Sequence, residues 1–180
     1  MKYLIGFLAA LALIVVGGLA YVYSGAVEVA ASRPHGPVSG WLLPTAMRRA
    51  VQARADAPAP TRFTAAQVQA GLREYEEECA QCHGAPGVER AEWAKGLRPA
   101  PPDLARTADR WTASELHWIV RNGVRMTGMP AMGAHHSPQD IWSIVAFVQT
   151  LPRTTPEAYR RMRQAGAPAP GAPETPGHRH

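Results

Sequence analysis

Residues 78–87 read ECAQCHGAPG and contain both cysteines of the 180-residue chain, Cys79 and Cys82, with His83 directly after the second. This pattern has three interpretations: a dithiol redox pair, half of a zinc site, or the attachment point of a c-type haem. The residues around the motif and further along the chain decide between these three interpretations.

The chain on both sides of the motif has the periodicity of helices. A capping box at Thr64 predicts a helix from about residue 65 to 82, and a second at Ser137 predicts one over residues 138–151. Thr112 or Ser114 can cap a further helix that ends at Gly123. Residues 96–104, GLRPAPPDL, are too rich in proline to be helical at their centre. No strand pattern is present, so we predict an all-α fold.

A redox pair and a zinc site both fit the motif poorly. Cys-x-x-Cys redox motifs usually lie at a helix start within a β-α-β pattern, whereas this motif ends a predicted helix. A structural zinc ion needs four ligands, so the cysteines would have to recruit His83, His135 or His136 at a spacing that does not match Cys2His2 sites.

Haem attachment accounts for all three residues of the motif. One helical turn separates Cys79 from Cys82, so both sulfur atoms can reach one edge of a porphyrin while His83 points at the iron. The opposite axial position then needs a ligand. The loop RMTGMPAMGAHH (125–136) offers the methionines Met126, Met129 and Met132, because a thioether is an iron ligand that raises the reduction potential.

The histidines and the other methionines of this loop have simpler interpretations. We expect Met126 and Met132 to fill the core, which is the usual role of methionine. We expect His135 and His136 to face solvent, with a secondary role as backup ligands.

Four stretches together carry a resemblance to a known family: YEEECAQCHGAPG (75–87), PPDL (101–104), NGVRMTGMPAMG (122–133) and SPQDIWSIVAFVQTLP (137–152). From about residue 61 to 153 the chain resembles a class I c-type cytochrome of the bacterial monohaem kind. The resemblance implies a small helical bundle around one covalent haem, in which the first and last helices cross. The positions that match the crossing are Gly71, Tyr75 and Trp142.

The resemblance also implies roles for individual residues. Met129, in the GMPA stretch, matches the sixth iron ligand, opposite His83. The proline-rich segment of the family lines the haem edge, which suggests Pro101, Pro102 and Leu104 as contacts. The candidates for the propionate groups are Arg98, Trp93 and Trp111.

The N-terminus predicts a membrane anchor. Residues 3–23 carry no charge and are about long enough to cross a bilayer, with Lys2 before them on the cytoplasmic side. A cleaved signal peptide is the alternative, although its apolar region is usually shorter. Either way we expect the rest of the chain in the periplasm, attached to the bacterial inner membrane if the helix is retained.

The predicted organisation has four parts: an anchor (1–24), a linker with a short amphipathic helix from about residue 38 to 55 (25–60), the cytochrome domain (61–153), and a short helix with a Pro/Ala/Gly-rich tail that we expect to be disordered (154–180). Pro44 is tolerated in the linker helix only if it lies in the first turn. That helix could pack on the domain, space it from the membrane, or lie in the membrane interface.

The charge distribution gives no support for nucleic-acid binding. The net charge is +5, but residues 61–153 contain ten basic and ten acidic residues, so the excess lies in the flanks. Basic residues beside an anchor suit an anionic lipid surface.

A haem with two protein ligands has no open position for a substrate, so the resemblance implies one-electron transfer and not enzyme catalysis. The leading hypothesis is a membrane-anchored carrier that exchanges electrons with redox partners of a respiratory chain. The alternatives are a haem c subunit permanently docked to a dehydrogenase or terminal oxidase, and a haem peroxidase or ligand sensor. A single CxxCH motif disfavours a peroxidase, which would need a second electron store.

Overall fold

The computed structural model of the chain describes residues 1–166, and these are helical with no strand. They form two compact units, Met1–His35 and the chain from Gly36 onward, and each is described by itself. The all-α fold class is confirmed. The tail that we expected to be disordered, residues 167–180, lies outside the described residues.

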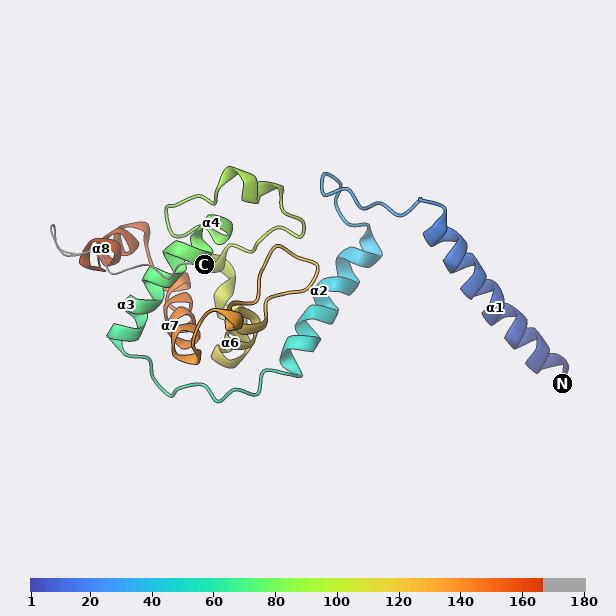
Figure 1. Ribbon diagram of the computed structural model, residues 1–180, viewed down its shortest axis with the longest axis horizontal. Helices are drawn as coiled ribbons and strands as arrows, with labels where there is room; N and C mark the ends of the chain where they lie inside the picture. Colours follow the sequence, from blue (N-terminus) through green and yellow to red (C-terminus); the bar gives the residue numbers. More distant parts are fainter. Residues whose placement is uncertain (167–180) are drawn as a thin grey trace. The chain divides into compact units, whose positions relative to one another are not determined.

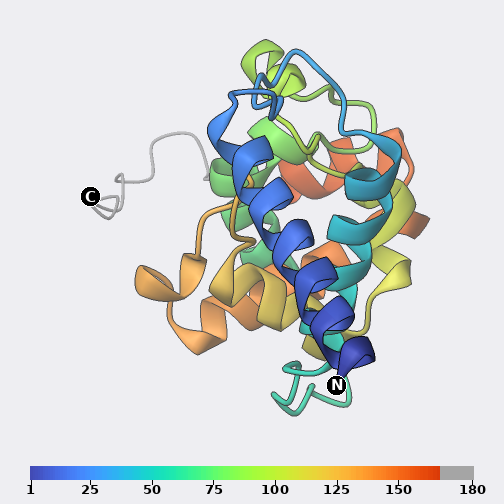
Figure 2. The same ribbon diagram turned by 90° about the vertical axis from the view of Figure 1, so that its right-hand side faces the viewer.

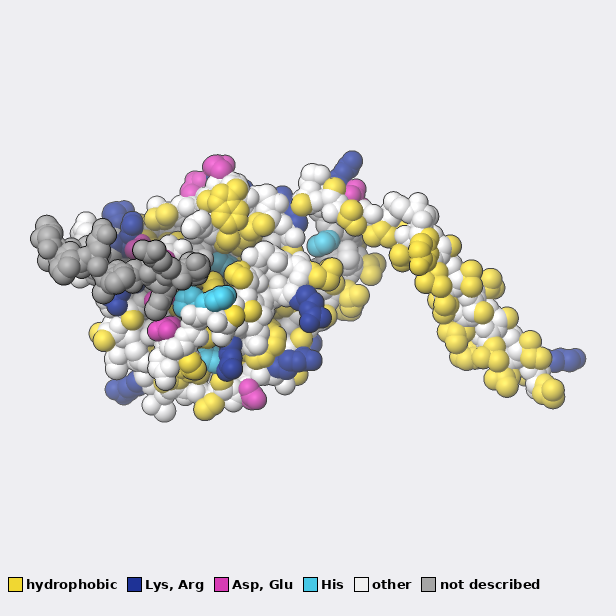
Figure 3. Space-filling model, viewed as in Figure 1, with side chains coloured by type: hydrophobic (Ala, Val, Ile, Leu, Met, Phe, Trp, Pro, Cys, Tyr) yellow, Lys and Arg dark blue, Asp and Glu magenta, His cyan; other side chains and the backbone are white. Residues whose placement is uncertain are grey.

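The first unit consists of α1 (Lys2–Tyr23) and the short segment after it. Its mean hydropathy reaches 2.5, and it is the one helix among residues 1–166 that is long and apolar enough to cross a membrane. Hydrophobic side chains cover the visible face of this helix in Figure 3. By its length and composition α1 could therefore span a membrane.

The second unit begins with α2 (Pro37–Gln52) and continues into the helices that surround the CxxCH motif. Pro44 lies inside α2 and not in its first turn, so that prediction is wrong. The hydroxyl of Thr45 donates to the carbonyl oxygen of Trp41 at 2.7 Å, which gives one carbonyl beside the proline an additional partner.

The predicted helix over residues 65–82 has three parts. It begins as α3 (Ala65–Glu74), widens into the π-helical turn η1 (Tyr75–Cys79) and ends as α4 (Ala80–His83). The Ala80 N–H donates to the Tyr75 carbonyl oxygen, which closes the π turn. Such turns are rare and recur at functional sites.

The chain continues through η2 (Glu92–Gly96), α5 (Leu104–Thr107), η3 (Ala108–Arg110), α6 (Ala113–Asn122), η4 (Met132–Ala134), α7 (Pro138–Val148), η5 (Leu151–Arg153) and α8 (Pro156–Gly166). Of these remaining helices, α6, α7 and α8 have ten or eleven residues and the others have three to five. Thr112 and Ser137 cap α6 and α7 with complete capping boxes, as predicted. The proline-rich segment between η2 and α5 is not helical, also as predicted.

The core forms where α3 and α7 cross (Figure 1). At this point a Cβ atom on Gly71 would overlap the carbonyl group of Ser143, so only glycine allows the two backbones to approach this closely. Tyr75 and Phe147 then pack ring to ring beside the contact, with centroids 5.1 Å apart. The predicted crossing of the first and last helices is thus present, with Gly71 at its centre.

Candidate haem site

Cys79, Cys82 and His83 are positioned by the end of the helix that crosses α7. Cys79 is the last residue of the π turn, and Cys82 and His83 end α4. Both cysteines are half-buried free thiols, and His83 is also half-buried. The three reactive side chains of the motif therefore share one short stretch at the edge of the core.

Tyr75 anchors residues 79–84 to the hydrophobic core. Its ring is completely buried, and its hydroxyl donates a hydrogen bond of 2.6 Å to the carbonyl oxygen of Gly84, directly after His83. Burial raises the pKa of Tyr75 far above its usual range, so the hydroxyl remains a neutral donor. The helix before the cysteines and the turn after the histidine are thereby held by one side chain.

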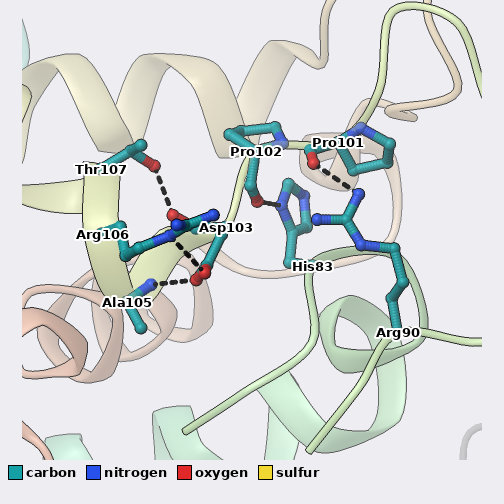
Figure 4. A network of polar contacts seen from close by, with 8 residues as sticks. All are labelled: His83, Arg90, Pro101, Pro102, Asp103, Ala105, Arg106 and Thr107. Carbon is teal, nitrogen blue, oxygen red and sulfur yellow. Dashed lines mark hydrogen bonds and ion pairs between the residues drawn. The ribbon is translucent and has the colours of Figure 1, made fainter. Parts of the chain in front are cut away.

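The imidazole of His83 is oriented by the proline-rich segment. Its Nδ1 atom lies 2.8 Å from the carbonyl oxygen of Pro102, as Figure 4 shows. A carbonyl oxygen only accepts, so Nδ1 carries the proton and Nε2 keeps its lone pair. Burial lowers the pKa of His83, and Arg90 lowers it further against the opposing effect of the Pro102 bond. A neutral imidazole with a fixed tautomer is the form that binds a metal.

Two further side chains fix the proline-rich segment itself. Arg90 donates from Nη1 to the carbonyl oxygen of Pro101 at 2.8 Å. Asp103 accepts from the Ala105 N–H at 3.0 Å and from Nε of Arg106 at 2.9 Å, which caps α5. Figure 4 shows these contacts on either side of Pro102. Sequence analysis missed Arg90, because a single arginine in a loop belongs to no periodic pattern.

The loop that carries Met129 is held by hydrogen bonds within the loop. The Met129 N–H donates to Oγ1 of Thr127 at 3.1 Å, and its carbonyl oxygen accepts from the Val124 N–H at 3.3 Å. Gly123 ends α6 with a φ of 63°, and a Cβ there would lie 2.6 Å from the Pro130 carbonyl group. The chain can therefore turn back tightly from α6 and place Met129 at the end of this helix.

The Met129 loop approaches the segment that leads to Pro102. A Cβ on Gly128 would lie 3.1 Å from Cδ2 of Leu97, which follows η2. In both Figure 1 and Figure 2 the chain between α4 and α5 leaves the helices as a long loop. Side chains from all of these segments pack on the same hydrophobic core, among them Cys79, Leu104, Trp111 and Met129. The fold therefore gathers residues from the two halves of the sequence around one apolar region.

Comparison with known proteins identifies this arrangement. Residues 66–148 match the family model described as cytochrome C oxidase, cbb3-type, subunit III. The segment forms a class I c-type cytochrome domain. No curated protein matches the chain. The match covers the crossing helices, the CxxCH motif and the Met129 loop, and it does not extend to α1 or α2.

The residues of the cytochrome domain fit a c-type haem better than the other two interpretations of the motif. Burial raises the pKa of Cys79 to about 12, whereas a redox-active dithiol needs a lowered thiol pKa. Within residues 1–166 no group of three or more His, Cys, Asp or Glu side chains is arranged to hold a metal ion. The two free thiols, the oriented imidazole and the apolar setting that a c-type haem needs are all present.

His83 and the chain between α4 and α5 also line a polar hollow. It has a volume of about 280 Å³, and its lining includes Glu89, Arg90, Lys95 and Asp103. Neither cysteine nor Met129 contributes to it. A porphyrin ring is apolar, so this charged hollow is not where the haem fits.

The three residues predicted to contact the haem propionates differ in their surroundings. Arg98 is exposed and donates to the carbonyl oxygens of Lys95 and Leu97, so it stabilises its own loop. Trp93 is 59% exposed. Trp111 is half-buried, and the guanidinium carbon of Arg48 in α2 lies 4.5 Å from its ring centroid.

For the other residues of the Met129 loop, two of the four predictions are confirmed and two are wrong. Met132 is buried in the core as expected, whereas Met126 is 90% exposed, so that prediction is wrong. The positive φ of Met126, 60°, places it at the tip of a turn where no core is within reach. His135 is exposed as expected, but His136 is half-buried with Nε2 3.3 Å from a carboxylate oxygen of Glu74. The solvent-facing prediction is therefore wrong for His136.

Proposed function

We propose that the cytochrome domain is a membrane-anchored one-electron carrier with a single haem c. Cys79 and Cys82 would attach the haem through thioether bonds, and His83 and Met129 would be the axial ligands. The domain is a haem-based electron-transfer domain by its family match. The proposal adds the covalent attachment, the ligand pair, the anchor and the periplasmic side of the inner membrane.

The observation that carries the proposal is the 2.8 Å contact between His83 Nδ1 and the Pro102 carbonyl oxygen. This contact favours a neutral imidazole with Nε2 unprotonated and orients the ring, which supports His83 as the axial ligand.

The haem, when bound, supplies the redox chemistry by cycling its iron between the ferrous and ferric states. The chain supplies the rest. Its apolar core keeps water from the site, the Pro102 carbonyl orients His83, and the thioether of Met129 favours a higher reduction potential than a second histidine would. With two side chains as ligands no position remains for a substrate, which supports a carrier over a haem enzyme or ligand sensor.

The helix α1 supports the anchor and the location. It is apolar throughout apart from Lys2 at its start, and lysine before a first span favours a cytoplasmic N-terminus. The cytochrome domain would then face the periplasm, where it would exchange electrons with redox partners of a respiratory chain through small, transient interfaces. The neutral charge balance of residues 61–153 speaks against a nucleic-acid partner.

A second candidate is a haem c subunit that stays bound to an oxidoreductase complex. The family description, which names an oxidase subunit, favours it. The two candidates share the haem chemistry and differ only in whether the protein leaves its partner.

The test uses full-length protein expressed with a cytochrome c maturation system. We expect one haem per chain that remains attached in a denaturing gel, a redox titration that fits one electron, and retention in the membrane after carbonate washing. Cys79→Ser and Cys82→Ser should each weaken the covalent haem stain, whereas Ser143→Ala should not.

Three results would contradict parts of this proposal. A chain without covalent haem would refute the attachment, and a chain washed off by carbonate would refute the anchor. Extraction in gentle detergent distinguishes the two candidates: a monomeric cytochrome supports the carrier, and stable co-purification with an oxidoreductase supports the subunit.

A further inference from the structure

The helix α2 has one face that is bound to the cytochrome domain. Val51 is 1% exposed, Met47 is half-buried, and the guanidinium group of Arg48 lies over the ring of Trp111. Just after the helix, the carbonyl oxygen of Ala57 accepts a hydrogen bond of 2.7 Å from the Ser114 hydroxyl. The second half of α2 is therefore fixed on the domain.

The opposite face of the first half of α2 is apolar and exposed within the second unit, as far as the structure describes it. Trp41 is 68% exposed, and Val38 and Leu42 are also exposed. Val38, Trp41 and Leu42 occupy positions i, i+3 and i+4 of one face, and at 3.6 residues per turn Val51 lies on the other side of the helix. Figure 3 shows hydrophobic side chains over this first half of α2.

A basic hollow follows the apolar residues along the same helix. It has a volume of about 320 Å³ and is lined by Pro44, Thr45, Arg48, Arg49 and Gln52. Residues 29–55 contain four arginines and no acidic residue, so the whole segment around α2 is positively charged. An apolar turn followed by arginines complements a surface that is apolar inside and negatively charged at its rim.

The position of α2 in the chain limits what can cover this face. Only residues 24–36 connect the end of α1 to the start of α2. If α1 crosses the membrane, as the proposed function requires, this connection spans at most about 45 Å and leaves α2 within reach of the lipid headgroups. An amphipathic helix with tryptophan and leucine on one side and arginine nearby is typical of helices that lie in a membrane interface.

We propose that the exposed face of α2 binds the surface of an anionic lipid bilayer. Val38, Trp41 and Leu42 would enter the interface, and the exposed Arg49 would bind a lipid phosphate group. Because the other face of α2 is packed on the cytochrome domain, the bound helix would hold the domain at the membrane surface. This inference rests on the proposed anchor and goes beyond it, since α1 alone would leave the domain free on a flexible tether.

The test is photo-crosslinking of the full-length, haem-loaded protein in nanodiscs of phosphatidylcholine with or without phosphatidylglycerol. The photoreactive residue p-benzoylphenylalanine replaces Leu42 in one protein. In the control it replaces Trp93, a residue of the cytochrome domain with similar exposure to Trp41. We expect lipid adducts on the peptide that contains residue 42 and few on the peptide that contains residue 93.

The arginines are tested in the same nanodiscs. Arg49→Gln should reduce the preference for phosphatidylglycerol over phosphatidylcholine at residue 42 by about fivefold, the effect expected for one basic residue at an anionic surface. Arg110→Gln, an exposed arginine of the cytochrome domain, should leave that preference unchanged.

Two results would overturn the inference while leaving the anchor intact. One is a chain that enters nanodiscs but gives no more lipid adduct at residue 42 than at residue 93. The other is a crosslink from residue 42 to a second copy of the chain or to another protein. A chain that does not enter nanodiscs and is removed by carbonate would instead contradict the proposed anchor, and the inference with it.

Discussion

The Nδ1 atom of His83 lies 2.8 Å from the carbonyl oxygen of Pro102, and the carbonyl oxygen of the preceding Pro101 lies 2.8 Å from Nη1 of Arg90. One arginine thus supports the segment that orients the candidate iron ligand. A hydrogen bond from a charged donor contributes about 1.5–3 kcal/mol, and the half-buried position of Arg90 favours the lower end of this range.

Arg90→Ala is therefore expected to lower the free energy of unfolding of the haem-loaded protein by about 1.5 kcal/mol. The measurement is guanidinium unfolding followed through the haem absorbance. Arg98→Ala is the matched control, because Arg98 also donates to backbone carbonyls but is exposed and bonds only within its own loop. The control should change the stability by less than about 0.5 kcal/mol. Equal losses in the two variants would show that Arg90 gives the His83 segment no particular support.

The crossing of α3 and α7 predicts a large effect of a single methyl group. A Cβ on Gly71 would overlap the carbonyl group of Ser143, which is backbone and cannot rotate away. We expect Gly71→Ala to cost about 3 kcal/mol of stability, the upper end of the usual cost of overpacking. The measurement is the shift of the denaturation midpoint of the haem-loaded protein.

Gly96→Ala is the control for this crossing, since a Cβ at Gly96 meets no atom within 4 Å. It should change the stability by no more than about 0.5 kcal/mol. A Gly71→Ala protein as stable as this control would mean that the helices can separate without loss, which would contradict the packing described for the core.

Much of the helical fold could be predicted because its signals are local. The capping boxes at Thr64, Thr112 and Ser137 are each complete, with side chain and backbone bonds in both directions. Each depends on residues three apart, so the sequence shows them directly. The CxxCH motif is equally local, since one helical turn contains it.

The features that sequence analysis missed depend on contacts between distant segments. The π turn at Tyr75–Cys79 forms where Tyr75 is drawn into the core and bonds to Gly84. The contact of His136 with Glu74 joins the Met129 loop region to α3. Pro44 is held within α2 although its local preference opposes this. None of these three features produces a periodic pattern in the sequence, because each depends on tertiary packing.

A buried histidine predicts how the stability depends on pH. His117 is 4% exposed and stacks on Trp142 with centroids 4.2 Å apart, and within residues 1–166 its Nε2 atom has no hydrogen-bond partner. Burial lowers the pKa of His117, and the nearby Arg121 lowers it further. Below the ordinary histidine pKa of about 6.5, the unfolded chain therefore binds a proton that the folded chain does not.

Since the unfolded state binds more protons, stability should fall as the pH is lowered from about 7 to about 5. His117→Phe keeps a flat ring on Trp142 and removes the titrating group, so its stability should fall less over the same range. The measurement is chemical denaturation at a series of pH values. His35→Gln, at an exposed position outside the cytochrome domain, should follow the wild type. If His117→Phe also follows the wild type, protonation of His117 does not limit stability in acid.

The two methionines at the tip of the loop after α6 provide the sharpest test of the sixth ligand. Met129 is half-buried against the core and held by Thr127 and Val124, whereas Met126, in the same turn, is 90% exposed. A thioether ligand raises the potential of a c-type haem. Met129→Ala should therefore lower the midpoint potential by on the order of 100 mV, a part of the span of about 0.8 V that axial ligands control.

The same variant should lose the weak near-infrared band that arises from sulfur-to-iron charge transfer, and its reduced form should bind carbon monoxide. Met126→Ala should keep the band, the potential and the resistance to carbon monoxide. Recruitment of His135 or His136 in Met129→Ala would block carbon monoxide, but it would still remove the band and lower the potential, because an imidazole replaces the thioether. A band that persists in Met129→Ala and disappears in Met126→Ala would transfer the ligand assignment to the exposed methionine.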